Sequence, residues 1–142
     1  MHWLNKSGLV TGAGDKACAA YLNKLNIRAE KRFGKQCCQQ ESVCDGTKLT
    51  FDFYFPDEKT AVEIALSLGN PQTEFERDIF KAILANDGGK PVAKLVLIGR
   101  SGSVKRHNRG DSLAIVKLVK AHHNIDVEVR ELCSKNICAP LM

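Results

Sequence analysis

The chain has 142 residues, of which 44% are hydrophobic, and its 21 basic and 16 acidic residues give a net charge of +5. This length suffices for one domain with a hydrophobic core, and the composition is that of an ordinary globular protein. The sequence contains no apolar run near the ~20 residues of a membrane helix, and its first residues lack the apolar stretch of a signal peptide. We therefore expect a cytoplasmic protein with a single domain over residues 1–142 and no membrane partner.

Apolar periodicity and turn residues predict elements in the order α, β, β, β, α, β, α, β. We expect a helix at 13–25, a short strand at 27–33, a loop at 34–47, hairpin strands at 48–55 and 60–68, a helix from Thr73 to about residue 86, a strand buried on both faces at 93–99, a basic loop at 100–110, a helix from 111 or 112 to about 122, and a final strand at 125–132. A hairpin followed by a strand–helix–strand crossover predicts an α/β fold, with a mixed sheet flanked by helices.

Two features of this pattern predict the helix after the hairpin in more detail. Thr73 is followed three residues later by Glu76, which is the spacing of a capping box. Phe75, Ile79 and Ile83 share one face of the helix, with Phe80 and Leu84 adjacent to it.

Charge is distributed unevenly along the chain. Residues 24–35 carry five bases and one acid, and residues 100–120 carry six bases and one acid, whereas residues 57–87 carry seven acids and three bases. A basic surface around an acidic centre suits a protein that holds phosphates and performs metal chemistry on them. The alternative is ordinary charge on a solvated surface.

Six cysteines are many for a short cytoplasmic chain. Cys18 lies in an alanine-rich helical stretch and is interpreted as core filler. The other five are Cys37, Cys38, Cys44, Cys133 and Cys138. Their spacing differs from the paired C-x2-C of zinc sites, so free thiols, disulfides and a structural zinc stay open as alternatives.

The stretch FDFYFPDEKTAVEIAL, residues 51–66, places one acid in each of two strands with period-two alternation. If Phe55 pairs with Thr60 around the turn, paired residue numbers sum to 115 and Asp52 lies opposite Glu63. Directly opposed residues have Cβ atoms ~4.5–5.5 Å apart on one face of the sheet. The other face then carries the apolar set, which is Phe51, Phe53, Phe55, Val62, Ile64 and Leu66.

Two like charges at this distance repel, so a cation, a shared proton or a nearby base is expected to neutralise the pair. Mg²⁺ fits well, because it prefers oxygen ligands and usually takes only one or two carboxylates, with waters and phosphate oxygens. Ala61, Ala65 and Ser67 share the face of Glu63, and such small side chains leave room for a ligand or a helix. The alternatives are a hydrated sheet face and a buried hydrogen-bonded pair.

The combination of Asp52, the hairpin, Glu63-Ile64-Ala65 and the helix TEFERDIFKAILA resembles the PD-(D/E)xK nucleases, the restriction-endonuclease-like superfamily. GAGDKACAAYL is similar to the first-helix pattern of that superfamily, with Asp15 where a Glu is common. The resemblance covers residues 13–99 and implies a single-domain αβββαβ core, here followed by a C-terminal helix and strand.

What the resemblance implies is hydrolysis of phosphodiester bonds in DNA. Mg²⁺ or Mn²⁺ would be held by Asp52, Glu63 and the main-chain carbonyl of Ile64, with Asp15 in an outer shell or at a second metal. Such an ion lowers the pKa of a bound water and offsets the charge that grows on the phosphate.

One position departs from the motif, because Ala65 stands where the family has a lysine. The candidates to replace this lysine are Lys81 and Arg77 on the following helix, and an ordinary surface charge is the strong alternative for each. Lys48 is four residues from Asp52, about 13 Å along a strand at ~3.3 Å per residue, and is too distant without reaching back.

The basic loop is expected to contact the nucleic-acid backbone through Arg100, Lys105, Arg106 and Arg109. A flexible surface loop is the alternative. If the chain forms an oligomer, we expect a twofold dimer, which would place two sites on two strands.

Three other functions compete with DNA cleavage. One is an inactive nucleic-acid-binding module on the same fold, which Ala65 favours. Another is a non-enzymatic interaction protein with structural cysteines, and the third is cleavage of RNA or of branched or single-stranded DNA.

Overall fold

A computed structural model describes residues 38–65 and 69–131 of the chain. Its elements are β1 (Cys38–Ser42), β2 (Thr50–Phe55), β3 (Thr60–Ala65), α3 (Pro71–Asp87), β4 (Lys94–Gly99), α4 (Ser103–His107), α5 (Gly110–His123) and β5 (Asp126–Glu131). The predicted helix at 13–25 and the predicted strand at 27–33 lie outside the described residues. None of the described helices is long and apolar enough to cross a membrane.

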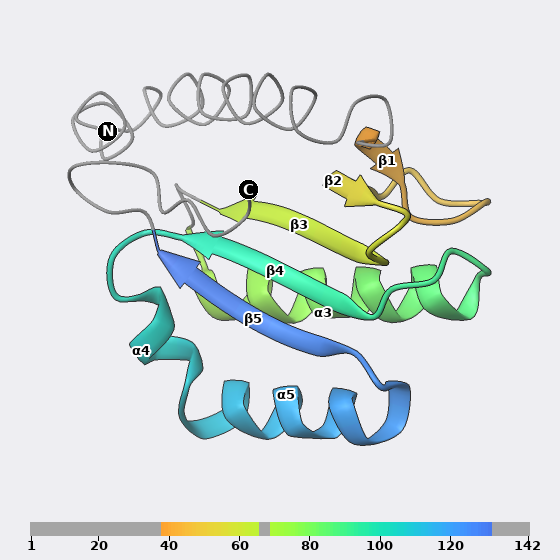
Figure 1. The fold of residues 1–142 in the computed structure, drawn as a ribbon. Helices are drawn as coiled ribbons and strands as arrows, with labels where there is room; N and C mark the ends of the chain where they lie inside the picture. Colours follow the sequence, from red (N-terminus) through yellow and green to blue (C-terminus); the bar gives the residue numbers. More distant parts are fainter. Residues whose placement is uncertain (1–37, 66–68, 132–142) are drawn as a thin grey trace.

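The strands form one mixed sheet in the order β1-β2-β3-β4-β5. β1, β2 and β3 are antiparallel neighbours, whereas β4 is parallel to both β3 and β5. Figure 1 shows α3 and α5 on the same face of the sheet and α4 near the ends of β4 and β5. The predicted α/β fold with a mixed sheet and packed helices is therefore confirmed.

The hairpin has the register that the sequence predicts. Phe55 pairs with Thr60, Tyr54 with Ala61 and Phe53 with Val62. The turn is closed by the Lys59 N–H, which donates to the Pro56 carbonyl at 3.2 Å. Turn length and alternation thus determine which residues of β2 and β3 face each other.

Two elements lie in segments that we expected to be loops. β1 falls within 34–47, and α4 falls within 100–110. The sequence of β1, CQQES, contains no β-branched or aromatic residue, so it has no local strand signal. Its pairing with β2, which places Glu41 beside Phe51, makes it a strand.

The N-cap of helix α3 lies three residues earlier than predicted. Asn70, and not Thr73, is the N-cap, since Asn70 Oδ1 accepts a hydrogen bond from the Thr73 N–H at 3.2 Å. Pro71 occupies the first turn, where its missing N–H costs nothing. The predicted stop is confirmed, because the helix ends at Asp87 and the Gly88 N–H caps the Leu84 carbonyl.

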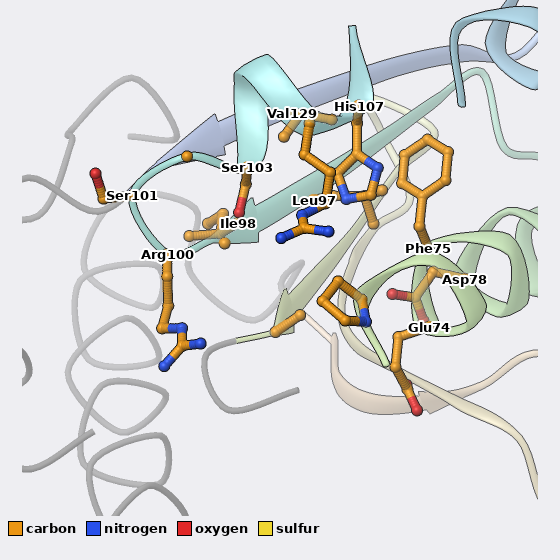
Figure 2. Close-up of a pocket in the computed structure, with 15 residues that line it drawn as sticks. Glu74, Phe75, Asp78, Leu97, Ile98, Arg100, Ser101, Ser103, His107 and Val129 are labelled. Carbon is orange, nitrogen blue, oxygen red and sulfur yellow. The ribbon is translucent and has the colours of Figure 1, made fainter. Parts of the chain in front are cut away.

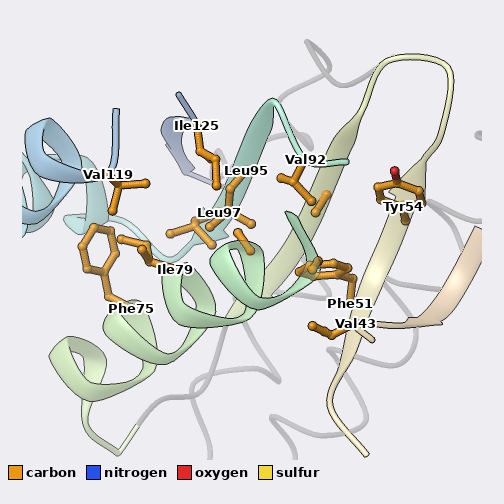
Figure 3. Packing of buried hydrophobic residues seen from close by; sticks show 13 residues of the cluster. Val43, Phe51, Tyr54, Phe75, Ile79, Val92, Leu95, Leu97, Val119 and Ile125 are labelled. Carbon is orange, nitrogen blue, oxygen red and sulfur yellow. The ribbon is translucent and has the colours of Figure 1, made fainter. Parts of the chain in front are cut away.

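The core fills the space between the sheet and the helices α3 and α5 (Figure 3). Phe51, Leu95 and Ile125 are fully buried there. Phe75 and Ile79 of the predicted face are buried, whereas the adjacent Phe80 is 55% exposed, and α3 also buries the charged residues Asp78 and Lys81. The helix is therefore rotated so that part of its polar face lies against the sheet.

The predicted alternation along β2 breaks at Asp52. The ring of Phe51 stacks on Tyr54, with centroids 6.3 Å apart, whereas Phe53 stacks on Phe55. Phe51 and Tyr54 belong to the core beneath the helices, so the expectation that Phe51 shares a face with Phe53 and Phe55 was wrong.

Cys44 follows β1 as a free, half-buried thiol. The expectations for Cys18, Cys37, Cys133 and Cys138 lie outside the described residues, as does the side chain of Cys38.

Candidate active site

Asp52 and Glu63 lie at the point where β2 and β3 stop pairing through their backbones. The Asp52 N–H donates to Glu63 Oε1 at 2.9 Å, and the Ile64 N–H donates to Asp52 Oδ2 at 2.7 Å. Each carboxylate therefore takes a hydrogen bond from the main chain of the opposite strand. The pair that the sequence predicts is brought together, and two N–H donors stabilise its negative charge.

Lys81, from the fourth turn of α3, contacts Glu63. Its ammonium nitrogen forms an ion pair with Glu63 Oε2, and both residues are buried, at 7% and 5% exposure. Oε2 accepts no well-directed hydrogen bond from the described residues, so the contact is one between charges. Burial lowers the pKa of Lys81, and the charge of Asp52 opposes this effect.

A cavity of about 250 Å³, here called the acidic cavity, opens beside these residues. Its walls include Asp52 and Glu63 from the sheet and Glu74, Asp78 and Lys81 from α3. The three helix residues have the i, i+4, i+7 spacing of a single helical stripe. The acidic cavity therefore lies between a charged stripe of α3 and the two strand carboxylates.

Asp78 has the most altered acidity in this cavity. Burial, together with the charges of Glu74 and Asp52, raises the pKa of Asp78 from 3.8 to about 7, and Arg77 opposes the shift. Lys81 Nζ lies 3.5 Å from Asp78 Oδ1. Because its pKa is near neutral, Asp78 is able both to accept and to deliver a proton at physiological pH.

Asp78 and Glu74 are functional candidates that the sequence pattern did not predict. The signal was present in TEFERDIFK, where Glu74, Asp78 and Lys81 share one side of the predicted helix. A polar stripe of this kind is normally exposed, so only the rotation of the helix against the sheet distinguishes it from surface charge.

The other residues predicted for catalysis are placed as follows. Arg77 is exposed and lines the acidic cavity, as does Lys48, which we had considered too distant. In extended backbone, the N–H and C=O of a residue point to the same neighbour, so the Ile64 carbonyl lies on the side of Asp52. Asp15 lies outside the described residues.

Two carboxylates with room beside them fit Mg²⁺ in donor chemistry, because this ion often takes one or two carboxylates and fills its shell with water and substrate oxygens. Across residues 38–65 and 69–131, no three Asp, Glu, His or Cys side chains are grouped as metal ligands. The residues therefore fit an ion that takes the rest of its shell from the main chain, water and substrate. They do not fit a fully enclosed protein site.

Four exposed residues are predicted to contact the nucleic-acid backbone, and they divide into two groups: Arg100 and Arg106, and Lys105 and Arg109. Arg100 and Arg106 line a second cavity of about 110 Å³, at the ends of β3 and β4. Figure 2 shows Glu74 and Asp78 on α3 across from Arg100. Ala65, Glu74 and Asp78 line both cavities, so the two adjoin, whereas Lys105 and Arg109 line neither.

Comparison with known proteins adds nothing to this geometry. No family model matches the chain, and no curated protein or solved structure matches it.

Proposed function

We propose that this protein is a metal-dependent nuclease that hydrolyses phosphodiester bonds in DNA, on a restriction-endonuclease-like core. The observation that carries the proposal is the contact of Lys81 with Glu63, beside Asp52. Ala65 stands where the family motif has a lysine. Lys81, from the adjoining helix α3, approaches the carboxylate of Glu63 instead. An acid pair with a buried ammonium is the set of charges that this chemistry requires.

The order of elements gives further support. The strands β1, β2 and β3, then α3, then β4, follow one another as in the βββαβ part of the expected core. Asp52 and Glu63 occupy the second and third of these strands, as the resemblance requires.

Each side chain has a role that follows from its position. Mg²⁺ or Mn²⁺ would be held by Asp52, Glu63 and the Ile64 carbonyl, and when bound it supplies an acidified water and positive charge for the phosphate. Lys81 places an ammonium against the oxygens of the same phosphate, where charge grows during the reaction. Asp78 holds Lys81 in place and is able to exchange a proton with the cavity.

Cleavage of plasmid and single-stranded DNA with Mn²⁺ or Mg²⁺ tests the proposal. We expect Asp52→Asn to lower the rate at least 100-fold, because it keeps an acceptor for the Ile64 N–H but removes the charge. Lys81→Met should cause a loss of similar size. Lys48→Met is the matched control, since Lys48 lines the same cavity without an ion pair among the described residues, and it should change the rate less than threefold.

Wild-type protein that cleaves no DNA or RNA with either ion would refute the nuclease proposal. Cleavage that survives Asp52→Asn in full would show that the activity lies elsewhere or in a contaminant.

A binding module without catalysis is the second candidate, and one observation favours it. Both oxygens of Glu63 are already engaged, by the Asp52 N–H and by Lys81, so an ion must compete with the ammonium for Oε2. Nucleic-acid binding without cleavage in the same assay would support this reading.

A further inference from the structure

The second cavity lies where ligands collect in α/β sheets, outside the carboxyl ends of parallel strands. Ala65 and Gly99 are the last residues of β3 and β4, and Val129 comes from the neighbouring β5. Its volume of about 110 Å³ is several times the ~10–15 Å³ that one water molecule needs, which leaves room for one ring or one phosphate group.

A chain of hydrogen bonds fixes the proton on His107, which lines this cavity (Figure 2). The Gln72 amide donates through Nε2 to the Glu76 carboxylate at 2.8 Å, so its oxygen faces Ser112. Ser112 Oγ donates to this oxygen at 2.9 Å. The hydroxyl has only one proton, so at its 2.9 Å contact with His107 Nδ1 it must accept.

His107 therefore carries its proton on Nδ1 in the neutral state, and Nε2 presents a lone pair. No donor among the described residues reaches Nε2. Burial, and then the charge of Arg106, lowers the pKa of His107, so the neutral form predominates at pH 7. The cavity thus contains an oriented hydrogen-bond acceptor.

The surroundings of His107 favour a flat, uncharged ring as its partner. The imidazole stacks on Phe75, with centroids 4.0 Å apart and planes within 6°. Leu97, Ile98 and Val129 provide apolar wall, while Arg100 and Arg106 lie at the cavity as cations. A phosphate has no N–H group for Nε2, but a nucleobase has such a group, an apolar face and flanking phosphates.

We propose that the second cavity receives an unpaired nucleobase of the substrate strand, with His107 Nε2 accepting a hydrogen bond from a base N–H group. Arg100 and Arg106 hold the phosphates on either side of that base. The proposal rests on the proposed function, since it requires a nucleic-acid substrate. It specifies that the strand is single, frayed or flipped next to the acidic cavity, because a paired base has no free edge to offer.

Binding of two eight-nucleotide DNA probes tests the proposed base site. The assay contains EDTA, so that cleavage cannot interfere. One probe is oligodeoxycytidylate, which offers an amino donor on each base, and the other is an abasic strand with the same phosphates. We expect the wild type to bind the cytidylate about tenfold more tightly, the worth of a hydrogen bond with its apolar contact.

Two variants assign the difference to His107. His107→Asn keeps a donor for Ser112 but has no atom at Nε2, so it should lose most of the preference for the cytidylate and keep only what the apolar wall provides. His107→Gln places an amide at the Nε2 position and should keep part of the preference. Equal binding of both probes by the wild type would overturn the base site while leaving nucleic-acid binding intact. Binding of neither probe would overturn the proposed function as well.

Discussion

Buried charge at Asp78 and Lys81 sets the chemistry of the acidic cavity. Both residues are buried, at 8% and 7% exposure, and burial disfavours the charged form of each, so it raises the pKa of Asp78 and lowers the pKa of Lys81. Their 3.5 Å contact opposes both effects. The pKa values of Asp78 and Lys81 therefore differ less from each other than those of the same groups in water.

The raised pKa of Asp78 makes stability depend on pH. Between its unfolded value of 3.8 and its folded value of about 7, the folded state binds more protons than the unfolded chain. The free energy of unfolding therefore falls as the pH rises through this range and levels off above it. The stability that the protonated Asp78 contributes is fully present below pH 4.

Asp78→Asn should remove that slope. At pH 8 we expect the variant to be more stable than the wild type by on the order of 2–4 kcal/mol, less whatever the Lys81 contact provides, and near pH 4 the two should be equal. Urea unfolding at pH 4, 5.5, 7 and 8 measures this. Asp57→Asn, in the exposed hairpin turn, is the control, and parallel curves for Asp78→Asn and wild type would contradict the raised pKa.

The junction between β4 and α4 is the element that shapes the second cavity. β4 ends at Gly99, and the Ser103 side chain packs directly over that residue. A Cβ at Gly99 would lie 2.3 Å from Ser103 Oγ and 2.9 Å from Ser103 Cβ. The hydroxyl can rotate away but the Cβ cannot, so this close approach requires glycine.

Gly99→Ala should therefore destabilise the fold by about 1–3 kcal/mol, as overpacking in a tight site does. Adding Ser103→Gly removes both close contacts and should restore most of the loss. Gly69→Ala is the control, because a Cβ there meets nothing within 4 Å. Chemical denaturation of the three proteins decides, and a double variant no more stable than Gly99→Ala would show that the clash lies elsewhere.

For the molecule as a whole, the distribution of charge matters more than the net value of +5. Acids from β2, β3 and α3 meet in one cavity, and Arg100 and Arg106 lie at the cavity that adjoins it. Lys105 and Arg109 are exposed but line neither cavity. A nucleic-acid strand that enters the acidic cavity would therefore meet Arg100 and Arg106 but not the other two cations.

Salt dependence should separate the two pairs. If Arg100 and Arg106 each neutralise one phosphate of a single strand, replacing both by Gln should reduce the slope of log K against log salt by about 1.4, at ~0.7 per phosphate. Lys105→Gln with Arg109→Gln should reduce it by less than about 0.5. Fluorescence anisotropy at salt concentrations between about 50 and 200 mM measures both slopes. Equal slopes for the two double variants would contradict the idea that Arg100 and Arg106 contact the phosphates and the other pair does not.

Much of the fold could be predicted, because periodicity, turn length and capping residues are local signals. The alternation around residues 56–59 and the four-residue turn were sufficient for the register of β2 and β3, and hence for the approach of Asp52 to Glu63. The apolar run of β4 likewise predicted a strand buried on both faces. These features depend on residues close together in the chain.

Other features depend on contacts between distant segments, and for them the sequence was ambiguous. β1 is a strand because β2 pairs with it, and Lys81 is a partner of Glu63 because α3 is rotated with Phe80 outward. The His107–Ser112–Gln72 chain joins three positions up to 40 residues apart. The amino-acid order alone determined β2 to β5, the helices α3 and α5, and the acid pair. Packing decided which charges are buried beside that pair, because burial of a polar helix face depends on the rotation of the helix against the sheet and not on local pattern.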